Sequence, residues 1–121
     1  MATTPFRFPA IAALAGRAPL GGQREVALAT FLAARLAFDA HPERGLAAQS
    51  RAERAVQART WLSTMTLPAN VRTTLLQVID ASAQEAPAAA EAVRGLLAAA
   101  ASYLDTRSKT ELERLAIALD R

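Results

Sequence analysis

Residues 23–42 read QREVALATFLAARLAFDAHP and predict a long helix, residues 23–40, that ends before His41-Pro42. On a helical wheel this stretch is apolar almost all round, with large side chains on one side and mostly small ones on the other. The large side is the stripe of Leu28, Leu32 and Leu36 with Phe31 and Phe38 beside it, and the other side carries Val26, Ala33, Ala37 and Ala40. A helix of this kind needs burial on more than one side, so we expect either a central helix or an interface with another chain.

Four further segments repeat apolar residues at the 3-and-4 spacing of amphipathic helices. They span residues 46–65, 69–84, 87–104 and 108–121. Ser108 and Glu111 have the spacing of a capping box, which predicts that the last helix starts at Ser108. No segment alternates with the period of a strand, and the connections are short. We therefore predict an all-α, single-domain bundle of four to five antiparallel helices over residues 23–121.

Residues 1–22 form a different kind of segment, a proline-containing apolar arm that ends at Gly21-Gly22. Phe6 and Phe8 lie among its prolines, with Ile11 and Leu14 further along. The prolines interrupt the apolar run, which argues against a secretory signal peptide. An apolar segment outside the helical pattern must be covered by something. The arm either packs on its own bundle or docks on another subunit, and both interpretations stay open.

The residue inventory argues against catalysis. Alanine makes up about a quarter of the 121 residues, cysteine is absent, and His41 is the one histidine. Disulfides, thiolate metal sites and thiol nucleophiles are thereby excluded, and we expect no metal, no cofactor and no catalytic residue. Asp39, His41 and Glu43 could form a proton-transfer cluster, but a histidine at a helix end more often has a structural role. No apolar run is long enough to span a membrane, and we expect a cytoplasmic protein.

The positive charge is concentrated in the first half of the chain. Residues 1–60 hold eight arginines against four acidic residues, whereas residues 61–121 hold six basic residues against seven acidic ones. Thirteen arginines to one lysine, with so much alanine, is typical of a GC-rich bacterial genome. Four arginines nevertheless cluster on the second helix and its entry: Arg44, Arg51, Arg54 and Arg59. Such a cluster can bind phosphates, although the net charge of +3 is modest for a nucleic-acid-binding protein.

These patterns favour a non-enzymatic interaction or assembly subunit. It would bury the apolar surface of the first helix and the arm against another chain, either a second copy or a different protein. The predicted partner-binding residues are Phe6, Phe8, Phe31 and Phe38. The alternative is a small helical subunit of a ribonucleoprotein-type complex that binds nucleic acid through Arg44, Arg51, Arg54 and Arg59.

Overall fold

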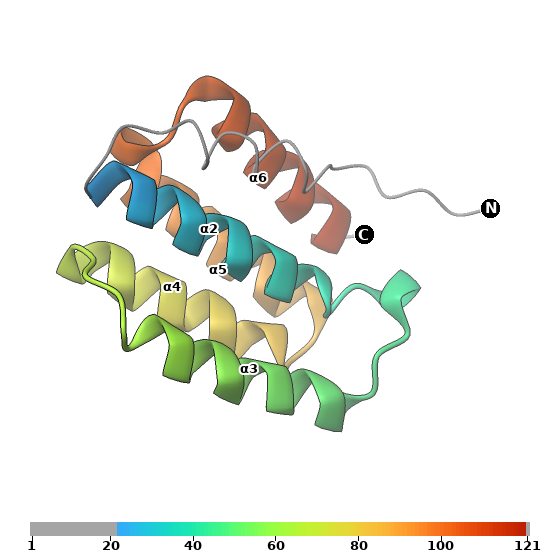
Figure 1. The fold of residues 1–121 in the computed structure, drawn as a ribbon. Helices are drawn as coiled ribbons and strands as arrows, with labels where there is room; N and C mark the ends of the chain where they lie inside the picture. The colour runs from blue at the N-terminus through green and yellow to red at the C-terminus, as the bar shows by residue number, and fades with distance from the viewer. Residues whose placement is uncertain (1–21, 121) are drawn as a thin grey trace.

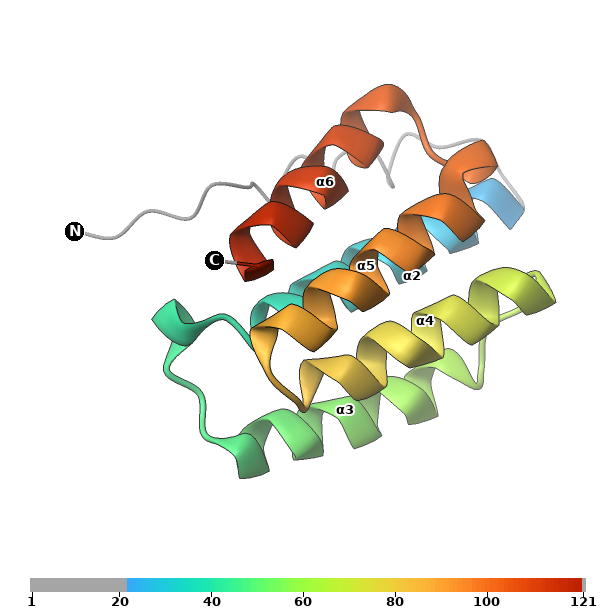
Figure 2. The same ribbon diagram turned by 180° about the vertical axis from the view of Figure 1, so that it is seen from behind.

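The computed structural model describes residues 22–120, and within them it confirms the all-α bundle (Figure 1). Consecutive helices run antiparallel, as Figures 1 and 2 show from opposite sides. The described part contains no strand. The helices are α2 (Gly22–Phe38), α3 (Ala48–Leu62), α4 (Ala69–Ser82), α5 (Ala86–Ala100) and α6 (Thr106–Asp120), with short 3-10 turns η1 (Pro42–Arg44) and η2 (Ala101–Tyr103). The predicted arm lies outside the described residues.

Helix α2 is the central helix, since it contacts α3, α4, α5 and α6. Its small side chains form the buried side: Val26, Ala29, Ala33 and Ala37 are all excluded from solvent. The leucine stripe points outward instead, and Leu28 is 42% exposed. Alanine leaves little side chain between two helix axes, so α4 and α5 can approach α2 closely on that side. The close packing therefore leaves Leu28, Leu32 and Leu36 on the outer side of α2, whereas Phe38, predicted beside them, is buried.

The three C-terminal helices follow the predicted pattern. Helices α4 and α5 bury Leu75, Ile79 and Leu96, and α6 buries Leu112 and Leu119. Helix α3 differs, because Ala55 and Leu62 are its only buried residues. It lies at the edge of the bundle and packs chiefly against α4. Val56 of this helix is exposed.

The predicted capping box at Ser108 and Glu111 is wrong, because α6 begins two residues before Ser108. The carboxylate Oδ1 of Asp105 accepts a hydrogen bond from the Ser108 amide at 2.8 Å, and the Asp105 carbonyl accepts the first intrahelical bond, from Lys109. Asp105 thus occupies the N-cap, and Ser108 lies buried in the first turn. An aspartate is as good a cap as a serine, and the sequence offers both.

Replacing Asp105 with Ala should lower the free energy of unfolding by about 1 kcal/mol, the usual cost of losing an N-cap. Ser108→Ala is the matched control and should cost clearly less, because it leaves that hydrogen bond in place. Urea unfolding followed by circular dichroism measures both. A larger loss for Ser108→Ala than for Asp105→Ala would contradict this assignment.

Candidate interaction face

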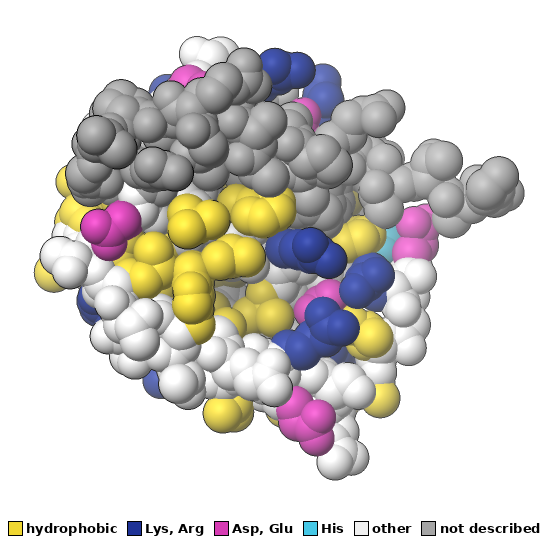
Figure 3. All heavy atoms as spheres, viewed as in Figure 1, with side chains coloured by type: hydrophobic (Ala, Val, Ile, Leu, Met, Phe, Trp, Pro, Cys, Tyr) yellow, Lys and Arg dark blue, Asp and Glu magenta, His cyan; other side chains and the backbone are white. Residues whose placement is uncertain are grey.

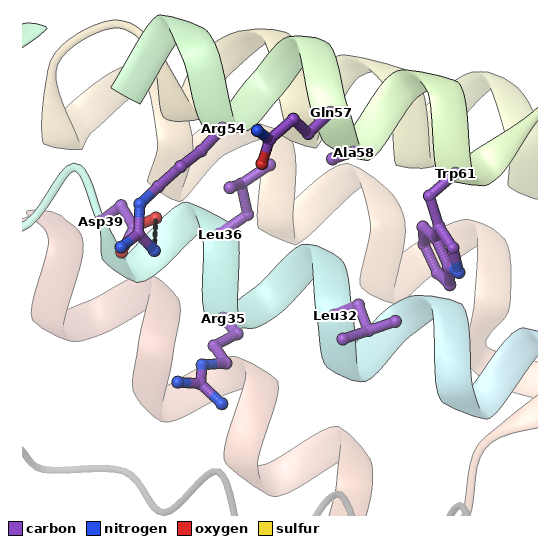
Figure 4. A pocket seen from close by; sticks show the side chains of 8 residues that line it. All are labelled: Leu32, Arg35, Leu36, Asp39, Arg54, Gln57, Ala58 and Trp61. Carbon is purple, nitrogen blue, oxygen red and sulfur yellow. Dashed lines mark hydrogen bonds and ion pairs between the residues drawn. The ribbon is translucent and has the colours of Figure 1, made fainter. Parts of the chain in front are cut away.

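A cavity of about 360 Å³ opens between α2 and α3 (Figure 4). It exists because α3 packs chiefly on α4 and buries so little of its own surface that it does not close over the leucine stripe of α2. The lining residues come from both helices and from the turn after α2: Leu32, Arg35 and Leu36 from α2, Asp39 from the turn, and Arg54, Gln57, Ala58 and Trp61 from α3. The cavity has an apolar end and a polar end, which are described in turn.

The apolar end is formed by Leu32 and Trp61, which lie near one another across the groove in Figure 4. Leu36 and Ala58 continue the apolar lining toward the other end. Leu28 lies one turn before Leu32 on the same side of α2 and extends the surface beyond the cavity. In the space-filling view these helices carry a continuous hydrophobic area beside a cluster of basic side chains (Figure 3). We call Leu28, Leu32, Leu36, Ala58 and Trp61, together with Arg35, the α2–α3 face.

The polar end is organised by Asp39, whose side chain is 4% exposed. Its Oδ1 pairs with Nη2 of Arg44, and its Oδ2 pairs with Nη1 of Arg54, each at 3.3 Å. A buried carboxylate needs such partners, and two arginines on one carboxylate leave this end with a surplus of positive charge. Arg35 adds to that surplus, since it is exposed and has no ion-pair partner among residues 22–120.

His41 has a structural role beside this end. Its Nδ1 accepts a hydrogen bond from the Glu43 amide at 3.1 Å, so His41 caps the turn η1. Its ring lies 5.5 Å from the ring of Phe38, and the Arg44 guanidinium stands 5.7 Å from that same ring. These contacts give His41 the structural role expected of a histidine at a helix end. They also hold the loop that brings Arg44 to Asp39.

Of the four residues predicted for partner binding, the structure describes two, Phe31 and Phe38. Phe38 is 8% exposed and belongs to the hydrophobic core, and Phe31 is partly buried. Phe6 and Phe8 lie outside the described residues. The face is instead built from the leucines of α2 and the lone tryptophan. For the leucines, the signal in the sequence was the helix that is apolar almost all round.

The four arginines predicted for nucleic-acid binding all have acceptors within the protein. Arg44 and Arg54 share Asp39. Arg51 donates to the carbonyl oxygen of Gln84 at 2.7 Å, and Arg59 forms an ion pair with Asp80. Gln84 follows α4 and Asp80 lies within it, so the contacts of Arg51 and Arg59 link α3 to α4. The ion pair of Arg54 links α3 to the end of α2. The sequence showed that these arginines cluster on the second helix and its entry, but it did not show which acceptors they would meet.

Removal of Arg54 should destabilise the fold, because the buried carboxylate of Asp39 loses one of its two ion-pair partners and retains only Arg44. For Arg54→Ala we expect a loss of about 1–2 kcal/mol in the free energy of unfolding, moderated because Arg54 is itself half exposed. Arg35→Ala is the matched control and should change stability by less than about 0.5 kcal/mol. Urea titration of both variants is the measurement, and equal losses would refute the role given to Arg54.

Residues 22–120 contain no group of three or more histidine, cysteine or acidic side chains placed to hold a metal ion. None of the helices described is both long enough and apolar enough to cross a membrane. Comparison of the chain with protein-family models, with curated proteins and with solved structures finds no match. The functional argument therefore starts from the geometry of the α2–α3 face.

Proposed function

We propose that this chain is a non-enzymatic interaction or assembly subunit that binds another chain on the α2–α3 face. The observation that carries the proposal is the outward leucine stripe of the central helix, which forms an apolar groove with Trp61. Single exposed leucines are ordinary in proteins. A groove lined by several apolar residues from two helices is the type of surface that accepts an amphipathic helix.

The residue types of the face also favour protein binding. Tryptophan and arginine are enriched among the residues that contribute most to binding energy at interfaces, and Trp61 and Arg35 stand at opposite parts of this groove. Charged groups beside an apolar centre add orientation and partner choice rather than bulk affinity. We therefore assign the leucines and Trp61 to affinity, and the arginines to the choice of partner.

Binding is a better reading than catalysis because of how the polar groups of the groove are used. Among the described lining residues Asp39 is the one carboxylate, and each of its oxygens is paired with an arginine. These two ion pairs use the carboxylate to hold the turn η1 and helix α3 in place, which is a structural role. The absence of cysteine fits the reducing environment of the cytoplasm, which we include in the proposal.

Nucleic-acid binding remains the alternative proposal, with less support. The four arginines would have to give up their contacts with Asp39, Asp80 and the Gln84 carbonyl, or donate to phosphate in addition to these acceptors. The positive surplus near Asp39 is the observation that keeps this alternative under consideration.

A photo-crosslinking amino acid at position 28, the most exposed point of the stripe, should give a discrete protein adduct in the native host. The same amino acid at Gln77, exposed on α4, is the matched control and should give none. Denaturing gels and mass spectrometry identify the adducts. The proposal fails if position 28 gives no adduct or the same pattern as position 77, and a nuclease-sensitive adduct would support the alternative.

A further inference from the structure

We propose that the occupant of the α2–α3 face is a second copy of this chain, docked so that the two α2 helices run antiparallel about a two-fold axis. This rests on the proposed function, since it names the partner of the same surface. It is argued from the order of charged and apolar residues along α2 and from the contacts those residues already make.

Four residues form one stripe on the outer side of α2, Glu25, Leu28, Leu32 and Arg35, and the buried Asp39 continues their spacing just beyond the end of the helix. They are separated alternately by three and four positions, the spacing that keeps side chains on a single seam between two helices. A two-fold axis at the level of residue 30 brings Leu28 opposite Leu32 of the second copy. The same rotation brings Glu25 opposite Arg35 of the second copy, and both contacts occur twice.

The charges at the two ends of this stripe are complementary. Arg35 has no ion-pair partner among residues 22–120, and it stands beside Arg54, which shares the single carboxylate of Asp39 with Arg44. At the other end, Oε2 of Glu25 accepts the Thr66 amide at 3.1 Å, and a carboxylate can accept several further hydrogen bonds. Figure 3 shows basic side chains and an acidic one on opposite sides of the hydrophobic area.

Antiparallel docking places these opposite charges against each other, and parallel docking does not. A parallel pair would place Arg35 against Arg35 and Glu25 against Glu25, and like charges at an interface are costly. In the antiparallel pair, each Arg35 acquires the carboxylate that it lacks among residues 22–120 of its own chain. An isologous contact of this kind closes on itself, so the assembly stops at a dimer.

The second copy also covers the rest of the groove. Its α2 would lie beside α3 and shield Trp61 and Leu32, which line the apolar end of the cavity. From Glu25 to Arg35 the stripe measures only about 15 Å at 1.5 Å per residue, so the interface is small. Small interfaces bind weakly, and we expect a dimer that dissociates on dilution in the micromolar range.

A charge-swap experiment tests the pairing directly. Glu25→Arg and Arg35→Glu should each raise the dissociation constant of the homodimer about tenfold or more, because each creates two like-charge contacts. An equimolar mixture of the two variants should restore dimers, since both contacts in the mixed pair join opposite charges. Analytical ultracentrifugation over a dilution series measures the wild type, the two variants and the mixture.

Trp61 emission supplies a second measurement. It is the sole tryptophan of the chain, so its emission should shift to shorter wavelength as the wild type is concentrated and the groove is covered. Glu25→Arg also removes the acceptor of the Thr66 amide, so circular dichroism must show that this variant is folded. Arg35→Glu breaks no hydrogen bond of the described residues, and on its own it should move the emission shift to concentrations about tenfold or more higher.

A wild type that stays monomeric at every concentration would overturn the second copy as occupant. A dimer that both charge swaps leave unchanged would overturn it as well. The adducts of position 28 separate these failures from failure of the proposed function. An adduct with a different protein contradicts the second copy and keeps the function, whereas no adduct at all removes the function.

Discussion

Small side chains on one side of α2 allow α4 and α5 to pack closely against it, and the rest of the arrangement depends on this contact. Ala29, Ala33 and Ala37 are buried there, where leucines would hold the helices apart. A close-packed interior has little space to spare, so the leucines of α2 cannot exchange places with these alanines. The outer position of the leucine stripe is a consequence of the inner position of the alanines.

Helix α3 is held mainly by polar contacts at its ends and side. Arg51 and Arg59 reach α4, and Arg54 reaches the end of α2. Arg72 of α4 donates to the carbonyl oxygen of Leu62 at the end of α3, and to that of Met65 just beyond it. These bonds fix the position of α3 without drawing it down onto the leucines. The groove stays open because arginine contacts to α4 and to the end of α2 hold α3 in place, and α3 has no large buried apolar surface.

Much of this fold could be predicted from the sequence, because helix periodicity survives even in an alanine-rich chain. The buried residues of α4, such as Leu75, follow directly from the 3-and-4 spacing. For α2 the wheel indicated two apolar sides but could not say which would be inside, because the choice depends on the space that α4 and α5 leave. Hydrophobicity favours the leucines for the inside, whereas close packing selects the alanines.

The site was less predictable than the fold, because its features arise from tertiary contacts. The ion pairs of Asp39 with Arg44 and Arg54 connect the turn after α2 with the turn η1 and with helix α3. No local sequence pattern predicts these pairs. The start of α6 shows the same limit on a smaller scale, since Asp105 and Ser108 are both good caps and tertiary packing decides between them. The one feature of the site already suggested by the sequence was that both sides of the first predicted helix are apolar.

The outer position of the leucine stripe is tested most directly by comparing Leu32→Ala with Leu75→Ala at a concentration where the protein is monomeric. Leu75 is fully buried, and its truncation should cost about 2–5 kcal/mol in the free energy of unfolding. Leu32 lies partly exposed in the groove, and its truncation should cost less than about 1.5 kcal/mol. Equal, large losses in urea unfolding would mean that Leu32 belongs to the core and that α2 has its leucines inside.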